Sequence, residues 1–120
     1  MKDPNKLTIA DYRKGLRKLK RITPLMRLML SEHVRNKQGS MRFLAQGISP
    51  TLSGIGMGSS YGRFARQIGL YLDNSPKRSG ERHYWMELIC AKSPNRDGDG
   101  RNVWIIRNRF VKALEAEGVI

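Results

Sequence analysis

Two apolar segments near the C-terminal end, separated by a polar loop, constrain the fold more than any other feature. Residues 84–92 and 102–107 are rich in aromatic and aliphatic side chains, whereas the loop between them contains Pro, Asn, Asp and Gly. Because such loops favour tight turns between strands, the pattern predicts a β-hairpin. The loop also carries Arg96 and Arg101. We therefore expect a hairpin whose tip is cationic and contacts a polyanion.

The charge of the chain indicates the same class of partner. The 120 residues, predicted to form one domain (1–120, with 1–7 flexible), include 23 Lys and Arg against 10 Asp and Glu, a net charge of +13. Residues 1–42 alone carry 12 basic and 3 acidic residues, a net charge of +9. A field of this sign attracts nucleic acid first and an acidic membrane surface second.

The sequence offers little to support catalysis, a metal site or a membrane location. Its two histidines and its single cysteine, Cys90, are widely separated, and the glycines Gly54, Gly56 and Gly58 lack the lysine of a phosphate-binding loop. No apolar run approaches the roughly 20 residues needed to span a bilayer. We expect a cytoplasmic, nucleoid-associated protein that is not an enzyme and has no cofactor, metal or membrane partner. His33 is expected on the surface near a helix end.

Local start signals predict most of the helices. Thr8 with Asp11 has the spacing of a capping box, Thr23 is followed by Pro24, and Ser40 precedes a short apolar segment. The predicted helices span residues 9–20, 24–34, 40–46, 50–55, 59–72 and 109–117, with a glycine-rich tight turn before the fifth.

The order of these elements, helices followed by a β-hairpin and a closing helix, is that of a winged helix-turn-helix domain. The predicted fold class is α+β, mainly α, with a two-stranded β-hairpin as the wing. More narrowly, the chain resembles the MarR-type winged-helix regulators in three places: Thr-Pro-Leu-Met-Arg-Leu-Met-Leu-Ser-Glu-His (23–33), Pro-Asn-Arg-Asp-Gly-Asp-Gly-Arg (94–101), and the strand at 103–106 that runs into a closing helix.

This resemblance implies DNA binding and a homodimer. It also implies that an aspartate in the loop, Asp97 or Asp99, orients Arg101 through a salt bridge. The family's Leu-Thr-x-x-Gly after the second wing strand is replaced by Ile-Arg-Asn-Arg-Phe, and the terminal helices that build the family's dimer interface are short. The sequence leaves a small-molecule effector open.

Two segments compete for the role of recognition helix, residues 50–55 and residues 59–72. We favour the second because the first is short and rich in glycine. Serines at a helix N-terminus can bind phosphate, and arginine can donate two hydrogen bonds to a guanine edge. The side chains expected to face DNA are Ser59, Ser60, Tyr61, Arg63, Arg66 and Gln67 in the recognition helix, Lys92, Asn95, Arg96 and Arg101 in the wing, and Arg13, Arg17, Lys18, Lys20, Arg21 and Arg42 as phosphate contacts.

Three functions are compatible with these features. The first is a sequence-specific double-stranded DNA-binding protein, a small transcriptional regulator acting as a homodimer on a roughly palindromic site. The second is a plasmid- or phage-type architectural, segregation or replication protein with the same fold. The third is an RNA- or ribosome-associated basic protein, which the basic helix permits and the wing favours less.

Overall fold

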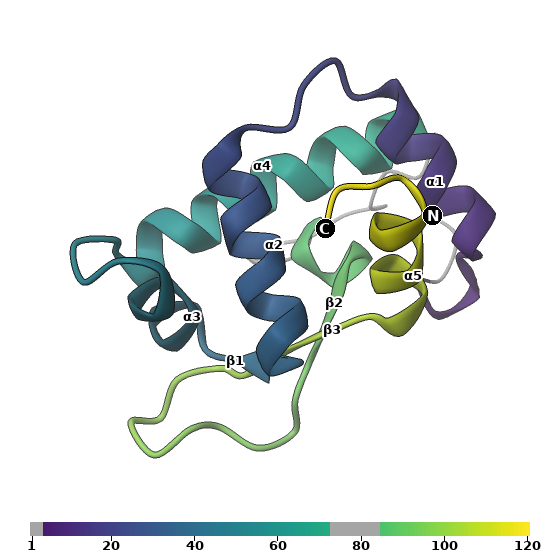
Figure 1. Cartoon of the computed structure of the whole chain (residues 1–120). Helices are drawn as coiled ribbons and strands as arrows, with labels where there is room; N and C mark the ends of the chain where they lie inside the picture. The colour runs from purple at the N-terminus through teal and green to yellow at the C-terminus, as the bar shows by residue number, and fades with distance from the viewer. Residues whose placement is uncertain (1–3, 73–84) are drawn as a thin grey trace.

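The structure, a computed structural model, describes residues 4–72 and 85–120. This part of the chain is mainly helical, with a small antiparallel sheet, which confirms the predicted α+β class (Figure 1). The α-helices are α1 (Ile9–Lys18), α2 (Pro24–Asn36), α3 (Met41–Ile48), α4 (Gly54–Tyr71) and α5 (Asn108–Ala116); the strands are β1 (Gln38–Gly39), β2 (Cys90–Lys92) and β3 (Trp104–Ile106); and the 3-10 helices are η1 (Pro4–Lys6) and η2 (Trp85–Leu88).

The first three predicted helix starts are confirmed, because each depends on a short-range hydrogen bond. Thr8 and Asp11 form the expected capping box at α1. The Thr23 hydroxyl accepts a hydrogen bond from the backbone N–H of Met26, and the Ser40 hydroxyl caps α3 in the same way. The helix ends differ from prediction by two residues each: α1 ends earlier, whereas α2 and α3 end later.

Helix α4 corrects the prediction for the middle of the chain. Residues 54–71 form one continuous helix whose cap is Ser53, and the Ser53 hydroxyl accepts a hydrogen bond of 2.9 Å from the backbone N–H of Gly56. The expected break between residues 50–55 and 59–72 is therefore wrong, and the glycines lie inside the helix. A glycine in a helix costs about 1 kcal/mol relative to alanine, and burial of one side of α4 outweighs that cost.

The sheet has three strands in the order β1-β3-β2, all antiparallel, rather than the two that were predicted. Pairing of β2 with β3 confirms the predicted hairpin. The additional strand β1 pairs with the other edge of β3, so that Gly39 lies opposite Trp104. Two residues are too few to show an alternating pattern, so the sequence predicted no strand at β1. Residues 85–88 form η2 instead of extending β2.

The N-terminal helix packs at one end of α4. A Cβ atom placed on Gly15 would lie 2.9 Å from the Cγ2 atom of Ile68, so α1 crosses the C-terminal half of α4 at close range. The Tyr12 hydroxyl donates a hydrogen bond of 2.6 Å to the carbonyl of Leu88, and burial raises the pKa of Tyr12 to about 12. Figure 1 shows α1 with α5 on one side of the molecule and α3 with the hairpin loop on the other.

Residues 4–7, part of the segment expected to be flexible, contact the rest of the chain. Leu7 is buried in the core, and the side chain of Asn5 accepts a hydrogen bond of 2.7 Å from the guanidinium of Arg107. Arg109 donates to the backbone carbonyls of Asn5 and Leu7. The segment before α1 is therefore packed against the start of α5.

Candidate nucleic-acid interface

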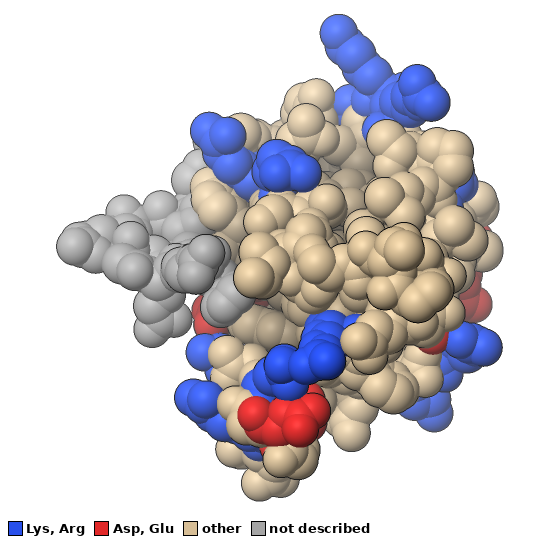
Figure 2. All heavy atoms as spheres, turned by 90° about the vertical axis from the view of Figure 1, so that its left-hand side faces the viewer, with Lys and Arg blue, Asp and Glu red and all other residues tan. Residues whose placement is uncertain are grey.

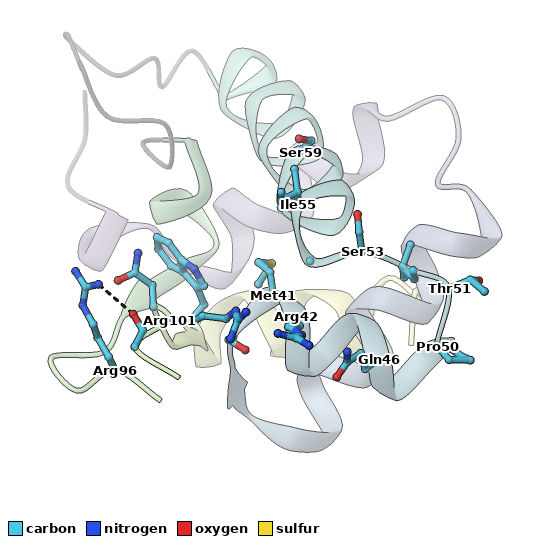
Figure 3. A pocket seen from close by; sticks show the side chains of 17 residues that line it. Met41, Arg42, Gln46, Pro50, Thr51, Ser53, Ile55, Ser59, Arg96 and Arg101 are labelled. Carbon is cyan, nitrogen blue, oxygen red and sulfur yellow. Dashed lines mark hydrogen bonds between the residues drawn. The ribbon is translucent and has the colours of Figure 1, made fainter. Parts of the chain in front are cut away.

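An open groove of about 760 Å³ lies between the α3–α4 pair and the hairpin loop (residues 93–103). Within the part of the chain that the structure describes, the only charged side chains that line it are three arginines, Arg42, Arg96 and Arg101, and no carboxylate does. Figure 3 shows Arg42 on α3, Ile55 and Ser59 on α4, and the two loop arginines on the other side of the groove. The other residues that line it are Ser40, Met41, Gln46, Pro50, Thr51, Leu52, Ser53, Gly54, Gly58, Gly100, Asn102 and Trp104.

The crossing of α3 and α4 depends on the absence of a side chain at Gly54. A Cβ atom at this position would lie 2.8 Å from the backbone nitrogen of Arg42 and 2.9 Å from its Cα atom. Met41, Met57 and Trp104 are buried. The start of α4 is therefore held directly against the start of α3, with its outer side directed to the groove.

The tip of the hairpin loop is ordered by Asp97. Its carboxylate accepts hydrogen bonds from the backbone N–H groups of Arg101 (2.8 Å) and Asp99 (2.9 Å), and the bond from Arg101 is the main reason that the pKa of Asp97 lies below its usual value. The guanidinium of Arg101 lies 3.2 Å from the carboxylate of Asp99. The predicted salt bridge from Arg101 to a loop aspartate is thus present, and its partner is Asp99. Arg96 donates to the carbonyl of Gly100 at 3.1 Å, the contact dashed in Figure 3.

Of the side chains predicted to face DNA from the recognition helix, only Ser59 lines the groove. The side chains of Arg63, Arg66 and Gln67 are exposed further along α4, and Ser60 is half-buried. Tyr61 is a correction: its side chain is 0% exposed, so it is not available to DNA. Its position, one helical turn before the buried Phe64 and Ala65, places it on the inner side of α4.

His33 was expected on the surface and is instead completely buried. Its Nε2 atom lies 2.9 Å from the carbonyl of Trp104, and its Nδ1 atom lies 3.1 Å from the hydroxyl of Tyr61. Because a carbonyl only accepts, Nε2 carries the proton in the neutral ring. Burial lowers the pKa of His33. The Tyr61 hydroxyl also lies 3.2 Å from the carbonyl of Met29, and its single proton is shared between this carbonyl and Nδ1 of His33. These groups therefore connect α2, α4 and β3.

The predicted phosphate contacts divide into two groups. Arg42 lies in the groove, whereas the other five belong to α1 or follow it, at the far end of α4. Ile55 at the groove and Ile68 beneath α1 are separated by about 20 Å along the helix axis, at 1.5 Å per residue. Arg13 and Arg17 each lie 2.8 Å from the carboxylate of Glu117, and these contacts lower the pKa of Glu117. The five α1-end residues are Arg13, Arg17, Lys18, Lys20 and Arg21.

The face that carries the groove is mainly uncharged. Figure 2 shows it with Lys and Arg side chains beside the hairpin loop and near the edges, and with acidic side chains next to the basic ones at the lower edge. The predicted wing residues Lys92 and Asn95 do not line the groove. The ammonium group of Lys92 lies 5.7 Å from the ring centroid of Trp104, and Asn95 is exposed.

The sequence analysis missed most of the groove residues, and it missed those of residues 50–55 because that segment was set aside as too rich in glycine. The missed residues include Gln46 on α3, Thr51 and Ser53 in the turn, and Ile55 at the start of α4. Ser53 had a recognisable signal, since serine is a preferred cap. Ile55 had none, because a single apolar residue between glycines shows no periodicity.

Comparison of the chain with protein-family models, with curated proteins and with solved structures found no match. The MarR-type resemblance and the homodimer therefore stay predictions. Within residues 4–72 and 85–120, no helix has both the length and the apolar character needed to cross a membrane. In the same part of the chain, no three His, Cys, Asp or Glu side chains are grouped to hold a metal ion.

Proposed function

We propose that the chain is a winged helix-turn-helix protein that binds double-stranded DNA sequence-specifically, as a small non-enzymatic transcriptional regulator. Helices α3 and α4 would form the helix-turn-helix, and the β2–β3 hairpin would be the wing. Two features support this assignment: the strand order β1-β3-β2, with β1 between α2 and α3, and the groove that the hairpin loop lines together with the start of α4. The start of α4, residues 54–59, would enter the major groove, which is wide enough to admit an α-helix.

The observation that carries the proposal is the charge of the groove lining. Among the described residues that line the groove, Arg42, Arg96 and Arg101 are the only charged ones, and they come from both of its sides. Two rows of phosphates flank the major groove of DNA, so cations on either side of a projecting helix match that arrangement. The loop arginines are already oriented through Asp97, Asp99 and the Gly100 carbonyl, which lowers the entropy lost on binding.

Replacing Arg42 or Arg101 with alanine is expected to weaken binding of every DNA sequence, by about tenfold each at physiological salt. Each variant should also reduce the slope of log affinity against log salt by about one, because one phosphate contact is lost. Fluorescence anisotropy with a duplex selected from a random library measures both quantities. Lys112→Ala is the matched control, since it removes the same charge from an exposed position on α5.

If Arg42→Ala and Arg101→Ala bind like the Lys112→Ala control over the whole salt range, the groove is not the DNA-contacting surface. A homodimer would add a further signature, because selection should then recover two related half-sites with fixed spacing.

A specific observation also favours the architectural alternative. Lys14, Lys18, Lys20 and Arg21 are exposed at the opposite end of α4 from the groove, so one molecule would present two separated cationic surfaces. Such a protein could hold two duplexes together. Replacing these four residues with serine should then abolish capture of a labelled duplex by an immobilised one while leaving the affinity for a single duplex within about threefold. Unchanged capture by the variant would contradict the bridging function.

A further inference from the structure

We propose that Ile55 recognises the C5-methyl group of a thymine in the major groove, and that the preferred DNA site contains a T·A pair at this position. The inference rests on the proposed DNA binding and specifies what α4 recognises. Ile55 is 81% exposed, the largest exposure of any large apolar side chain among the described residues. It also lines the groove that contains the three arginines. A side chain this exposed contributes little to the folded core.

The residues around Ile55 make it the projecting group at this end of α4. Gly54 and Gly56 flank it and Gly58 follows, so none of these positions offers a competing side chain. Ser59 lies one turn further on the same side of the helix, as Figure 3 shows. Ile55 and Ser59 are therefore the side chains that α4 directs into the groove.

The chemistry of this surface matches thymine better than guanine. Arginine and lysine are the side chains that bind the acceptor edge of guanine most often, and the first basic residue of α4 is Arg63, more than two turns after its start. The C5-methyl of thymine is the apolar group that the base edges offer in the major groove, and small apolar side chains contact it. The hydroxyl of Ser59 can accompany that contact, because serine pairs with either a donor or an acceptor.

Replacement of single thymines by deoxyuridine tests the inference, because it removes the methyl group and leaves base pairing unchanged. The duplex would come from selection with the parent protein, and each thymine would be replaced in turn. We expect one position in each half-site to lose about fourfold in affinity, the factor for one buried methyl group. Ile55→Ala should bind the unmodified duplex with the same loss for each half-site and should show no further effect of deoxyuridine at that position.

Leu70→Ala is the matched control, because Leu70 is also exposed on α4, at 51%, and lies outside the groove. It should keep the full sensitivity to deoxyuridine. Two results would overturn the assignment of Ile55 without contradicting site-specific binding. One is that deoxyuridine lowers the affinity of the parent and of Ile55→Ala equally, and the other is that no thymine replacement lowers the affinity of the parent. Failure of the parent protein to select any sequence would instead contradict the proposed function.

Discussion

Replacing His33 with alanine is expected to lower the free energy of unfolding by about 3 kcal/mol, since a buried polar group left without its partner costs about 1–3 kcal/mol and the truncation also opens a cavity. The imidazole bonds the Trp104 carbonyl and the Tyr61 hydroxyl, so its removal affects β3 and α4 together. Urea denaturation of the parent and the variant at pH 7.5 measures the difference. A loss below about 0.5 kcal/mol, the usual range for surface substitutions, would contradict this account of the buried contacts.

His33 is also expected to make the free energy of unfolding depend on pH. Burial lowers the pKa of His33 in the folded state, so the unfolded chain binds a proton first as the pH falls below about 6.5. The free energy of unfolding is therefore expected to keep the full contribution of His33 above that pH and to decrease as the pH falls through it. His33→Gln, which keeps a donor and an acceptor but does not titrate, should remove this decrease between about pH 5 and 6.5. The carboxylates with lowered pKa, Glu32, Asp97 and Glu117, lose their contributions only in more acidic solution.

The parts of the fold that depend on local hydrogen bonds were predictable from the sequence. The caps at Thr8, Thr23 and Ser40 use contacts between residues three apart, and each is present. The β2–β3 hairpin was predictable for the same reason, because its loop contains residues suited to a turn. The short strand β1 was not, since it exists only through pairing with β3, which lies far along the chain.

The candidate site was harder to predict because its residues come together only through packing. The glycines of α4 suggested a break, yet Gly54 allows contact with α3 and so sets one side of the groove. Spacing alone could have placed Tyr61 on the buried side with Phe64 and Ala65. No sequence signal could have shown that the cations of α1 lie far from Arg42, because this distance depends on which end of α4 each helix contacts.

The two glycines Gly54 and Gly62 should therefore respond in opposite ways to the same substitution. Gly54→Ala is expected to cost about 1–3 kcal/mol, because its Cβ atom would lie within 2.9 Å of the Arg42 backbone and α4 must move away from α3. Gly62→Ala, with nothing within 4 Å of the added atom, should gain up to about 1 kcal/mol from helix propensity. Because displacement of α4 also distorts the groove, Gly54→Ala should weaken DNA binding at protein concentrations and temperatures where it remains folded, whereas Gly62→Ala should not. Thermal unfolding and anisotropy on the two variants test both statements, and equal effects at the two positions would show that the close α3–α4 crossing does not shape the groove.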